Sequence, residues 1–340
     1  MKVLLVGSNR SMAIERHFVK YLAKLGVEIS HFSAPDIFLD RYSKNILNKL
    51  LFKTKISTGY RGINKGLVDV AHQFKPDIIW IFKGMEIYAK TLSFLSKEFK
   101  LVNYNPDHPF VFSGPGSGNK NVSRSFSSYH AHITYIQYLK NEIESKYKIP
   151  TFVVPFGFEL GEEMDGFPDE DGEIRSLCFI GNPDRIRVEF ISKLIAEKIN
   201  LSLFGHGWGA YFKDGEYCKV HNAVYDKDFW VCVRKYRIQL NIFREHNIGS
   251  HNMRTFEIPA GGGIQLAPDT EEHRVFFEAN KEIFLYESFE ECVQKARYLL
   301  DLDFDSATQI RNAARTRSLT SEYSYENRAK QIYQVFKQLI

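Results

Sequence analysis

Short apolar segments that alternate with amphipathic helical segments are the feature that most constrains the fold of this chain. The first series of strand-like segments lies at 2–7, 27–34, 77–82, 101–104 and 132–136. A second series lies at 176–181, 201–205, 238–242, 263–267 and 282–286. Helical patterns separate these segments, and residues 325–340 are helical to the end. The alternation predicts an α/β fold with parallel sheets and helices on both faces.

A stretch rich in Gly, Pro and acidic residues, 155–174, interrupts this alternation and predicts an interdomain linker. The 340 residues also exceed what one ordinary core holds. We therefore expect an N-terminal domain over 1–155 and a C-terminal domain over 156–325. Residues 326–340 form a terminal helix, and a crossing back to the N-terminal domain is one arrangement for it.

The composition, 44% hydrophobic and 25% charged residues, is typical of a soluble globular protein. No apolar stretch approaches the roughly 20 residues of a spanning helix, and the start MKVLLVGSNR does not resemble a signal peptide. The cysteines, Cys178, Cys218, Cys232 and Cys292, lack the spacing of a metal site or a disulfide framework. Reduced thiols in a cytoplasmic protein are the simplest interpretation.

Charge is distributed unevenly along the chain. Residues 1–150 carry a net charge of +11, and residues 151–340 carry −7. A basic half favours binding of a phosphorylated substrate, an anionic membrane face or nucleic acid. The alternative is a solvated basic surface that is attracted to the acidic second domain. Nucleic-acid signatures are missing, so we expect no nucleic-acid partner. The apolar stretch 38–52, with Lys44 and Lys49 inside it and Lys53 and Lys55 directly after it, favours a peripheral contact with an anionic membrane.

The segment LNIFREHNIGSHNMRTFEIPAGGGIQL, residues 240–266, places charged groups at a predicted helix start between two strands. Ser250 or Asn252 is the expected helix cap, and free N–H groups at such a start attract anions. Arg254 and Glu257 fall on one helix face, where they either meet a ligand or form an intrahelical ion pair. The run 261–263, all glycine, predicts the helix stop.

Two other turns follow predicted strands. Gly181 opens GNPDRIR, in which Arg187 either neutralises a phosphate or forms an exposed pair with Asp184. The loop 7–12, GSNRSM, lacks both the dinucleotide and the Walker glycine patterns, and a plain strand-to-helix turn is its simplest interpretation.

Asp107 and His108 follow the predicted strand 101–104, between two prolines. A strand's carboxyl end is a suitable place for a general base, and an Asx-type turn cap is the structural alternative. The Gly/Ser-rich loop 113–128 is either a mobile lid or a surface loop.

We expect no metal ion. Asp169-Glu170-Asp171 and Asp301-Leu302-Asp303-Phe304-Asp305 resemble Asp-x-Asp patterns, but the first lies in the acidic linker and the second follows a helix. The histidines His206, His221, His246 and His251 lack zinc-like spacing, and no GxSxG hydrolase motif is present.

Several motifs together resemble a known family. NIFREHNIGSHNMRTFEIPAGGGIQLAPDTEEH, FIGNPDRIRVEFISKL, LFGHGW and SYENRAKQIY are similar to segments of CgeB-like (spore-maturation-protein-like) glycosyltransferases, with looser similarity in KPDIIWIFKG and VNYNPDHPF. These enzymes are relatives of the family-4 glycosyltransferases. The resemblance implies the GT-B fold, in which two Rossmann-like domains face each other across a cleft.

The resemblance also implies roles for individual residues. The C-terminal domain holds a nucleotide-sugar and the N-terminal domain holds the acceptor. Glu257 corresponds to the second glutamate of the family-4 pair and binds the ribose, whereas Gly249 stands where the first glutamate falls. The pyrophosphate is expected to meet two arginines, the turn at Gly181 and the helix start, that is, Arg187, Arg254, Ser250, His251 and Asn252.

The implied activity is a metal-independent transfer of a sugar from a nucleotide-sugar to a hydroxyl of a saccharide or lipid-linked glycan. No cofactor is expected, since the nucleotide-sugar is a substrate. If the reaction inverts, Asp107 or His108 is the expected base; if it retains, a side-chain base is not needed. The alternatives are a nucleotide-sugar epimerase or hydrolase, and a non-catalytic sugar- or nucleotide-binding protein.

Overall fold

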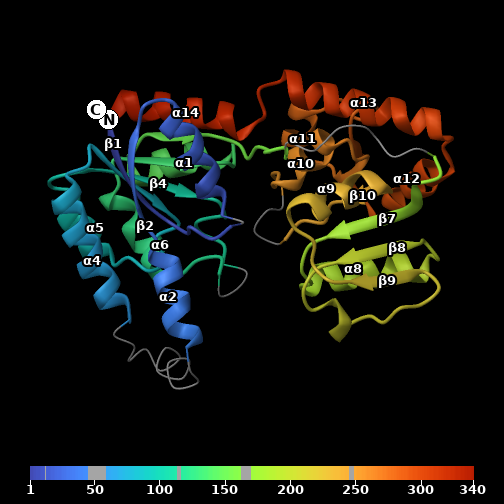
Figure 1. Ribbon diagram of the computed structural model, residues 1–340, viewed down its shortest axis with the longest axis horizontal. Helices are drawn as coiled ribbons and strands as arrows, with labels where there is room; N and C mark the ends of the chain where they lie inside the picture. Colours follow the sequence, from blue (N-terminus) through green and yellow to red (C-terminus); the bar gives the residue numbers. More distant parts are fainter. Residues whose placement is uncertain (12, 45–58, 113–115, 162–169, 245–248) are drawn as a thin grey trace. The chain divides into compact units, whose positions relative to one another are not determined.

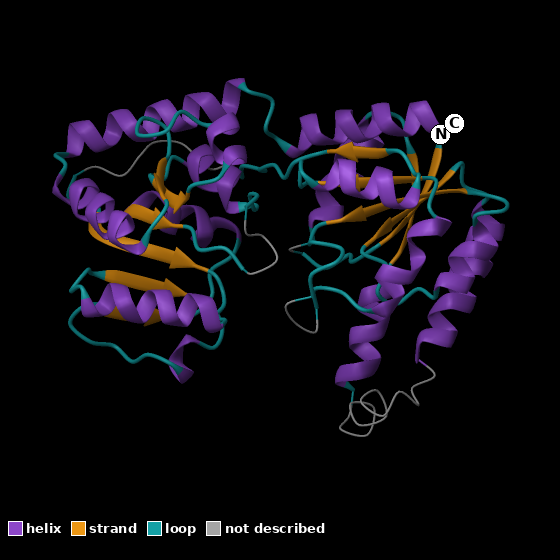
Figure 2. Ribbon diagram, turned by 180° about the vertical axis from the view of Figure 1, so that it is seen from behind, coloured by secondary structure: helices purple, strands orange, loops and turns teal. Residues whose placement is uncertain are grey.

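The computed structural model describes residues 1–11, 13–44, 59–112, 116–161, 170–244 and 249–340. These residues form two compact units. Unit 1 combines Met1–Pro155 with Tyr325–Ile340, and unit 2 is Phe156–Ser324. In both units parallel strands lie between helices, so the predicted α/β fold class with two parallel sheets is confirmed (Figures 1 and 2).

Unit 1 contains a six-stranded parallel sheet in the order β2-β1-β3-β4-β5-β6. Its strands are β1 (Lys2–Val6), β2 (Glu28–Phe32), β3 (Ile78–Phe82), β4 (Lys100–Asn105), β5 (Ala131–Thr134) and β6 (Thr151–Val153). Its helices are α1 (Ile14–Lys24), α2 (Ala34–Ser43), α4 (Gly59–Phe74), α5 (Ala89–Leu95), α6 (Lys120–Ser125), the 3-10 turn η1 (Phe126–Ser128), α7 (Leu139–Tyr147) and α14 (Tyr325–Leu339).

Unit 2 contains a second six-stranded parallel sheet, in the order β12-β11-β10-β7-β8-β9. Its strands are β7 (Ile174–Ile180), β8 (Leu201–Phe204), β9 (Cys218–His221), β10 (Tyr236–Leu240), β11 (Gln265–Pro268) and β12 (Phe284–Tyr286). Its helices are α8 (Arg185–Ala196), the 3-10 turn η2 (Trp208–Ala210), α9 (Asp226–Lys235), α10 (Arg254–Gly261), α11 (Glu271–Phe276), α12 (Phe289–Asp301) and α13 (Phe304–Thr320).

Each sheet has one point at which the strand order reverses. In unit 1 the chain passes from β1 to β2 on one side and returns to β3 on the other. In unit 2 it runs outward from β7 to β9 and returns to β10 beside β7. Open α/β sheets bind ligands outside the carboxyl ends of the strands at such a point. A ligand site is therefore expected at the turns after β1 and β3 in unit 1, and at the turns after β7 and β10 in unit 2.

The cores consist of the buried strands and the helix faces that cover them. All of β3 is buried, and its Trp80 is fully excluded from solvent. Such near-continuous apolar strands are expected in a parallel sheet that helices cover on both faces. In unit 2, Leu177 of β7 and Ile238 of β10 belong to one cluster with apolar residues of α8 and α12.

Two segments differ from the sequence-based expectations. The loop 113–128 contains the helix α6 and the turn η1, because Asn119 accepts hydrogen bonds from the N–H groups of Asn121 and Val122 and so caps α6. The stretch 155–174 was expected to be a linker between the domains. Near its start, however, Phe156 and Phe158 are buried, and both belong to unit 2.

Some expectations concern residues outside the described part of the chain. Lys49, Lys53 and Lys55 of the basic stretch lie outside it, as do Met12, Asp169, His246 and residues 113–115. No helix among the described residues is both long and apolar enough to cross a membrane.

Candidate functional site

A small pocket lies at the carboxyl ends of β7 and β10, where the strand order of unit 2 reverses. The loop after β10 and the first turns of α8 and α10 contribute to it. Its lining residues are Phe179, Ile180, Arg187, Gln239, Leu240, Asn241, Asn252, Arg254 and Ile258. The place agrees with the general rule for ligand sites in open α/β sheets.

Arg187 reaches this pocket from the first turn of α8, which Asp184 caps by accepting the Arg187 N–H at 3.0 Å. The guanidinium donates to the Ile242 carbonyl from Nε and Nη2, at 3.2 and 3.0 Å, and to the Asn182 carbonyl from Nη1. Burial lowers the pKa of Arg187 to about 10, and the nearby Arg244 cation contributes. The group stays charged at neutral pH, so the pocket has a fixed positive wall.

Arg187 is therefore not exposed, whereas the alternative of a surface pair with Asp184 requires an exposed side chain. Only 9% of it is accessible, and its Nε lies 3.5 Å from Asp184 Oδ2. Its charge is held by two carbonyls and one distant carboxylate. An anion placed in the pocket would add a stronger, charge-assisted contact.

Arg254 and Glu257 form an ion pair on the first turn of α10. The Arg254 guanidinium also lies 4.3 Å from the ring centre of Phe229, and its Nε donates to the Ile180 carbonyl at 3.5 Å. Of the two alternatives that the spacing allowed, a ligand contact or an intrahelical ion pair, the ion pair is thus present. Its position beside the pocket still allows a ligand to take one partner or both.

Asn252 caps α10. Its Oδ1 accepts the Thr255 N–H, and its own N–H donates to Thr255 Oγ1, a reciprocal arrangement like a capping box. The amide of Asn252 also exchanges hydrogen bonds with that of Asn241 at the end of β10. The glycine stop is confirmed, because Gly262 ends the helix with a φ of 83°.

Ser250 and His251 are fully buried and lie outside the pocket lining. The Ser250 hydroxyl donates to Glu272 Oε2 at 2.6 Å, and His251 Nδ1 contacts the same oxygen. His251 Nε2 accepts the Phe156 N–H at 3.3 Å, which leaves the ring proton on Nδ1. Both side chains hold the loop before α10 in place.

Gly181 and Gly249 have different structural reasons to be glycine. The Gly181 carbonyl accepts the indole N–H of Trp208 at 2.7 Å, and an added Cβ would lie 3.1 Å from the Phe179 ring. Gly249 has a φ of 81°, a conformation that strains other residues. A glutamate at Gly249 would therefore need a different backbone.

The candidate base residues of unit 1 have partners of their own. Asp107 forms an ion pair with Lys83, and its N–H donates to Asn105 Oδ1 at 3.1 Å in an Asx-type turn. His108 Nδ1 accepts the N–H groups of Phe110 and Val111, both at 3.2 Å. The structural alternative for this segment, a turn cap, is thus present.

Sequence reasoning missed Asn241, which lines the unit 2 pocket, and Glu272, which holds the segment before α10. Asn241 directly follows β10 and links the end of that strand to Asn252 at the start of α10. Glu272 anchors Ser250 and His251 from the start of α11. Asn241 fell inside the predicted strand 238–242, so nothing marked it as a site residue, whereas Glu272 had no local signal because its partners are 22 and 21 residues away. No cluster of three or more potential metal-ligating side chains occurs among the described residues.

Comparison with known proteins agrees with this picture. Residues 185–334 match a protein family described as glycosyl transferase-like. No curated protein matches the sequence.

Solved structures share the two-unit fold. Sucrose-phosphate synthase from Thermosynechococcus elongatus matches with a TM-score of 0.73 at 13% identity, over 100% of this chain and 99% of that one. Anabaena HepE in complex with UDP and glucose gives 0.68 at 11% identity, over 99% and 100%. UDP-GlcNAc 2-epimerase from Neisseria meningitidis bound to UDP-GlcNAc gives 0.58 at 16%, over 99% and 100%. At these identities the likeness shows the fold, which is that of GT-B proteins.

Proposed function

Because residues 185–334 carry a glycosyl transferase-like domain, we propose that this chain moves a sugar from a UDP-sugar to a hydroxyl of a saccharide or lipid-linked glycan. In this proposal unit 2 binds the donor and unit 1 binds the acceptor. Uridine is the first nucleoside to test, since HepE is solved with UDP and the epimerase with UDP-GlcNAc. A cytoplasmic location and a peripheral contact with an anionic membrane belong to the same proposal, supported by the +11 charge of residues 1–150.

One observation carries the proposal: two arginines and a helix start meet in the pocket where the unit 2 strand order reverses. Breaking the bond between a sugar and UDP develops negative charge on the leaving phosphate. Fixed cations and free N–H groups at a helix start stabilise that charge. In this chain Arg187 and Arg254 supply the positive charge that stabilises the leaving phosphate. We therefore propose a reaction that needs no metal ion.

Glu257 completes the donor site in this proposal by accepting hydrogen bonds from the ribose hydroxyls. An acidic side chain holds ribose hydroxyls in the same way in dinucleotide sites. Its ion pair with Arg254 keeps both side chains in place before the donor binds. The pyrophosphate then takes Arg254 as a partner, while the ribose takes Glu257.

Thermal denaturation with UDP-, GDP-, TDP- and CMP-sugars tests the donor site. A ligand at 100 times its Kd stabilises the folded protein by about 2.7 kcal/mol. We expect UDP-sugars to stabilise the wild type, and Glu257→Ala and Arg254→Ala to lose most of that effect. The matched controls are Glu189→Ala and Arg185→Ala, which change an exposed ion pair on α8. UDP-sugars should stabilise these variants as much as the wild type. A wild type that no nucleotide-sugar stabilises would contradict the proposal.

Analysis of the reaction products distinguishes transferase activity from epimerase activity. Epimerase activity is a second candidate because the Neisseria epimerase shares the fold. An epimerase converts UDP-GlcNAc to its epimer with no acceptor present. A transferase releases UDP, and it does so faster with a glycan acceptor. A protein that binds UDP-sugars and does neither would be a binding protein.

A further inference from the structure

The helix α11 places two side chains against the segment 250–255, which leads into α10. Thr270 caps α11 by accepting the His273 N–H at 3.1 Å, and this bond fixes the first turn of the helix. Glu272 and His273 lie in that turn and contact the segment. His273 is fully buried, and the Glu272 side chain is 12% exposed. α11 therefore offers a carboxylate and an imidazole in fixed positions.

Glu272 holds the first part of the segment. Its Oε2 accepts the Ser250 hydroxyl at 2.6 Å and also contacts His251 Nδ1, and both partners are fully buried. His251 Nε2 in turn accepts the Phe156 N–H at 3.3 Å, so the ring proton lies on Nδ1 and points to the carboxylate. One carboxylate oxygen thus fixes the two residues immediately before Asn252. Buried donors that lose such an acceptor are costly to leave unpaired.

His273 holds the second part of the segment through a chain of hydrogen bonds. Its Nδ1 lies 2.8 Å from the Pro268 carbonyl, which can only accept, so the ring carries a proton there. Burial lowers the pKa of His273 to about 4, so the ring is neutral at pH 7 and Nε2 has a lone pair. Nε2 accepts the Thr255 hydroxyl at 2.9 Å, and Thr255 Oγ1 accepts the Asn252 N–H at 3.3 Å. The chain therefore ends on the backbone of Asn252.

The residues between these two attachments belong to the unit 2 pocket. Asn252 and Arg254 both line it, and Asn252 exchanges hydrogen bonds with Asn241, another lining residue, at 3.1 and 2.8 Å. Glu272 and His273 are not among the lining residues. The places of two lining side chains therefore depend on groups that lie outside the pocket.

We propose that Glu272 and His273 are positioning residues of the donor pocket, a role that rests on the proposed function. They do not touch the nucleotide; they hold Asn252 and Arg254 in place before it binds. A site whose groups are already in place loses less conformational freedom on binding, which increases affinity. Loss of either attachment should therefore weaken nucleotide binding although every lining side chain is still present.

Titration calorimetry with UDP measures the role of Glu272. We expect Glu272→Ala to raise the Kd of UDP about 10–100-fold, the scale found when residues that orient metal ligands are removed. Glu272→Gln should recover most of the affinity, because its amide oxygen still accepts hydrogen bonds from Ser250 and His251. The matched control is Glu271→Ala, which removes the exposed neighbouring glutamate of the same helical turn and should leave the Kd unchanged.

Thr255 tests the second attachment independently. Thr255→Val keeps the shape of this fully buried side chain but removes the hydroxyl that joins His273 to Asn252. We expect it to raise the Kd of UDP about 5–100-fold, because it leaves two buried partners unpaired. Thr255→Ser retains a hydroxyl and should bind UDP nearly as tightly as the wild type. If Glu272→Ala does not fold, the two Thr255 variants decide.

Urea unfolding without UDP distinguishes positioning from a purely structural role. A purely structural network would lower the unfolding midpoint in the variants, whereas the protein that stays folded would bind UDP with the wild-type Kd. That result in both Glu272→Ala and Thr255→Val would overturn the proposal. A wild type that binds no UDP overturns the proposed function instead, and this failure is recognisable before any variant is tested.

Discussion

Two glycines, Gly181 and Gly205, bring the turns after β7 and β8 into backbone contact. A Cβ on Gly205 would lie 2.3 Å from the Gly181 carbonyl oxygen and 2.8 Å from its carbon. Both contacts are with backbone atoms, which cannot rotate away. Asn182 follows Gly181 in the chain, and its carbonyl accepts a hydrogen bond from Arg187 Nη1 at 3.0 Å. The close contact between the two glycines therefore also helps to position Arg187 in the pocket.

Gly205→Ala should therefore lower the free energy of unfolding of unit 2 by about 1–3 kcal/mol, the usual cost of overpacking. Gly209→Ala is the control: no atom lies within 4 Å of its added Cβ, and we expect a change within about 0.5 kcal/mol. Urea unfolding of both variants measures the difference. Equal midpoints for the two would show that the β7 and β8 turns adjust freely.

Sequence reasoning placed Arg187, Arg254 and Glu257 at strand ends and a helix start, because those positions follow from local patterns. It did not predict that Ile242 would supply the carbonyl that holds Arg187, a contact across 55 residues.

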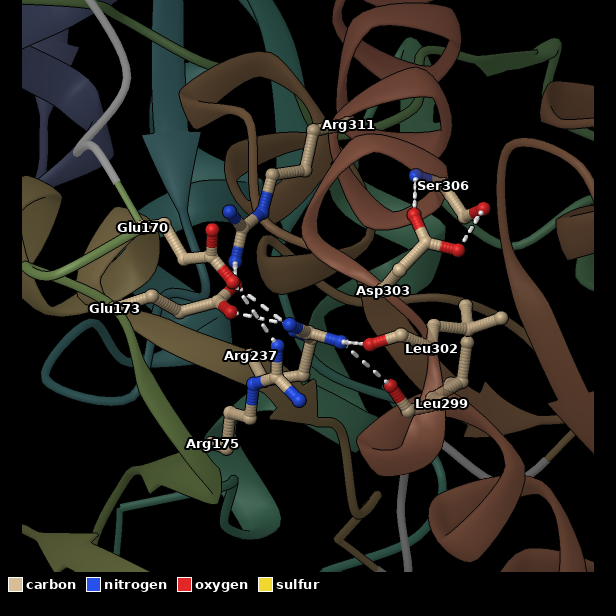
Figure 3. Close-up of polar contacts among 9 residues, drawn as sticks. All are labelled: Glu170, Glu173, Arg175, Arg237, Leu299, Leu302, Asp303, Ser306 and Arg311. Carbon is tan, nitrogen blue, oxygen red and sulfur yellow. Dashed lines mark hydrogen bonds and ion pairs between the residues drawn. The ribbon is translucent and has the colours of Figure 1, made fainter.

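A buried ion network ties the segment before β7 to β10, α12 and α13 (Figure 3). Glu173, just before β7, pairs with Arg237 of β10 and Arg311 of α13, and all three side chains are at most 1% exposed. Arg237 Nη1 also donates to the carbonyls of Leu299 and Leu302, at 3.2 and 2.6 Å, where α12 ends. One carboxylate thus serves two buried cations.

Glu173→Gln should cost about 3–5 kcal/mol of stability, because it leaves two buried guanidinium groups without their counter-charge. Glu170→Gln is the control: this glutamate, 66% exposed, pairs with Arg175 at 3.5 Å, and its loss should cost at most about 1 kcal/mol. Urea unfolding at neutral pH tests both. A small effect of Glu173→Gln would mean that water reaches the network.

The same network gives a pH dependence. Burial alone raises the pKa of Glu173, but Arg237 and Arg311 outweigh it and lower the pKa below its usual 4.5. The resulting stabilisation is present above pH 4.5 and is lost as the pH falls through the lowered value. Glu173→Gln should therefore flatten the acid side of the stability profile.

Most elements of both sheets were predicted from the sequence, but β6 and β9 were not. They are edge strands of three and four residues. In Thr151–Val153 and Cys218–His221 too few positions are available for a pattern of alternation to be distinguished from a loop. Their pairing with β5 and β8 comes from the sheet that is already in place.

The last helix, α14, belongs to unit 1 although it follows unit 2 in the sequence. It packs along α1, and the Phe336 ring centre lies 5.2 Å from that of Trp80. Tyr325 stacks on His17 at 4.6 Å. Figure 1 shows the chain ends next to each other, because α14 returns to the sheet in which β1 lies.

Removal of residues 325–340 should destabilise unit 1 and leave unit 2 folded, because it uncovers Trp80 and Phe18, both fully buried in the complete chain. Hydrogen exchange resolved by peptide should show faster exchange in β1, β3 and β4 and unchanged protection in β7 and β10. Removal of Ile340 alone, which is 62% exposed, is the control. Faster exchange in both units would indicate that they unfold together.

The return of α14 also sets an order of events during synthesis. Domains generally fold as they emerge from the ribosome, the N-terminal one first. Here the chain of unit 1 emerges first, but its final layer is translated only after all of unit 2. The domain that begins first is therefore completed last, and until then the nascent chain carries the apolar face that α14 covers in the complete chain.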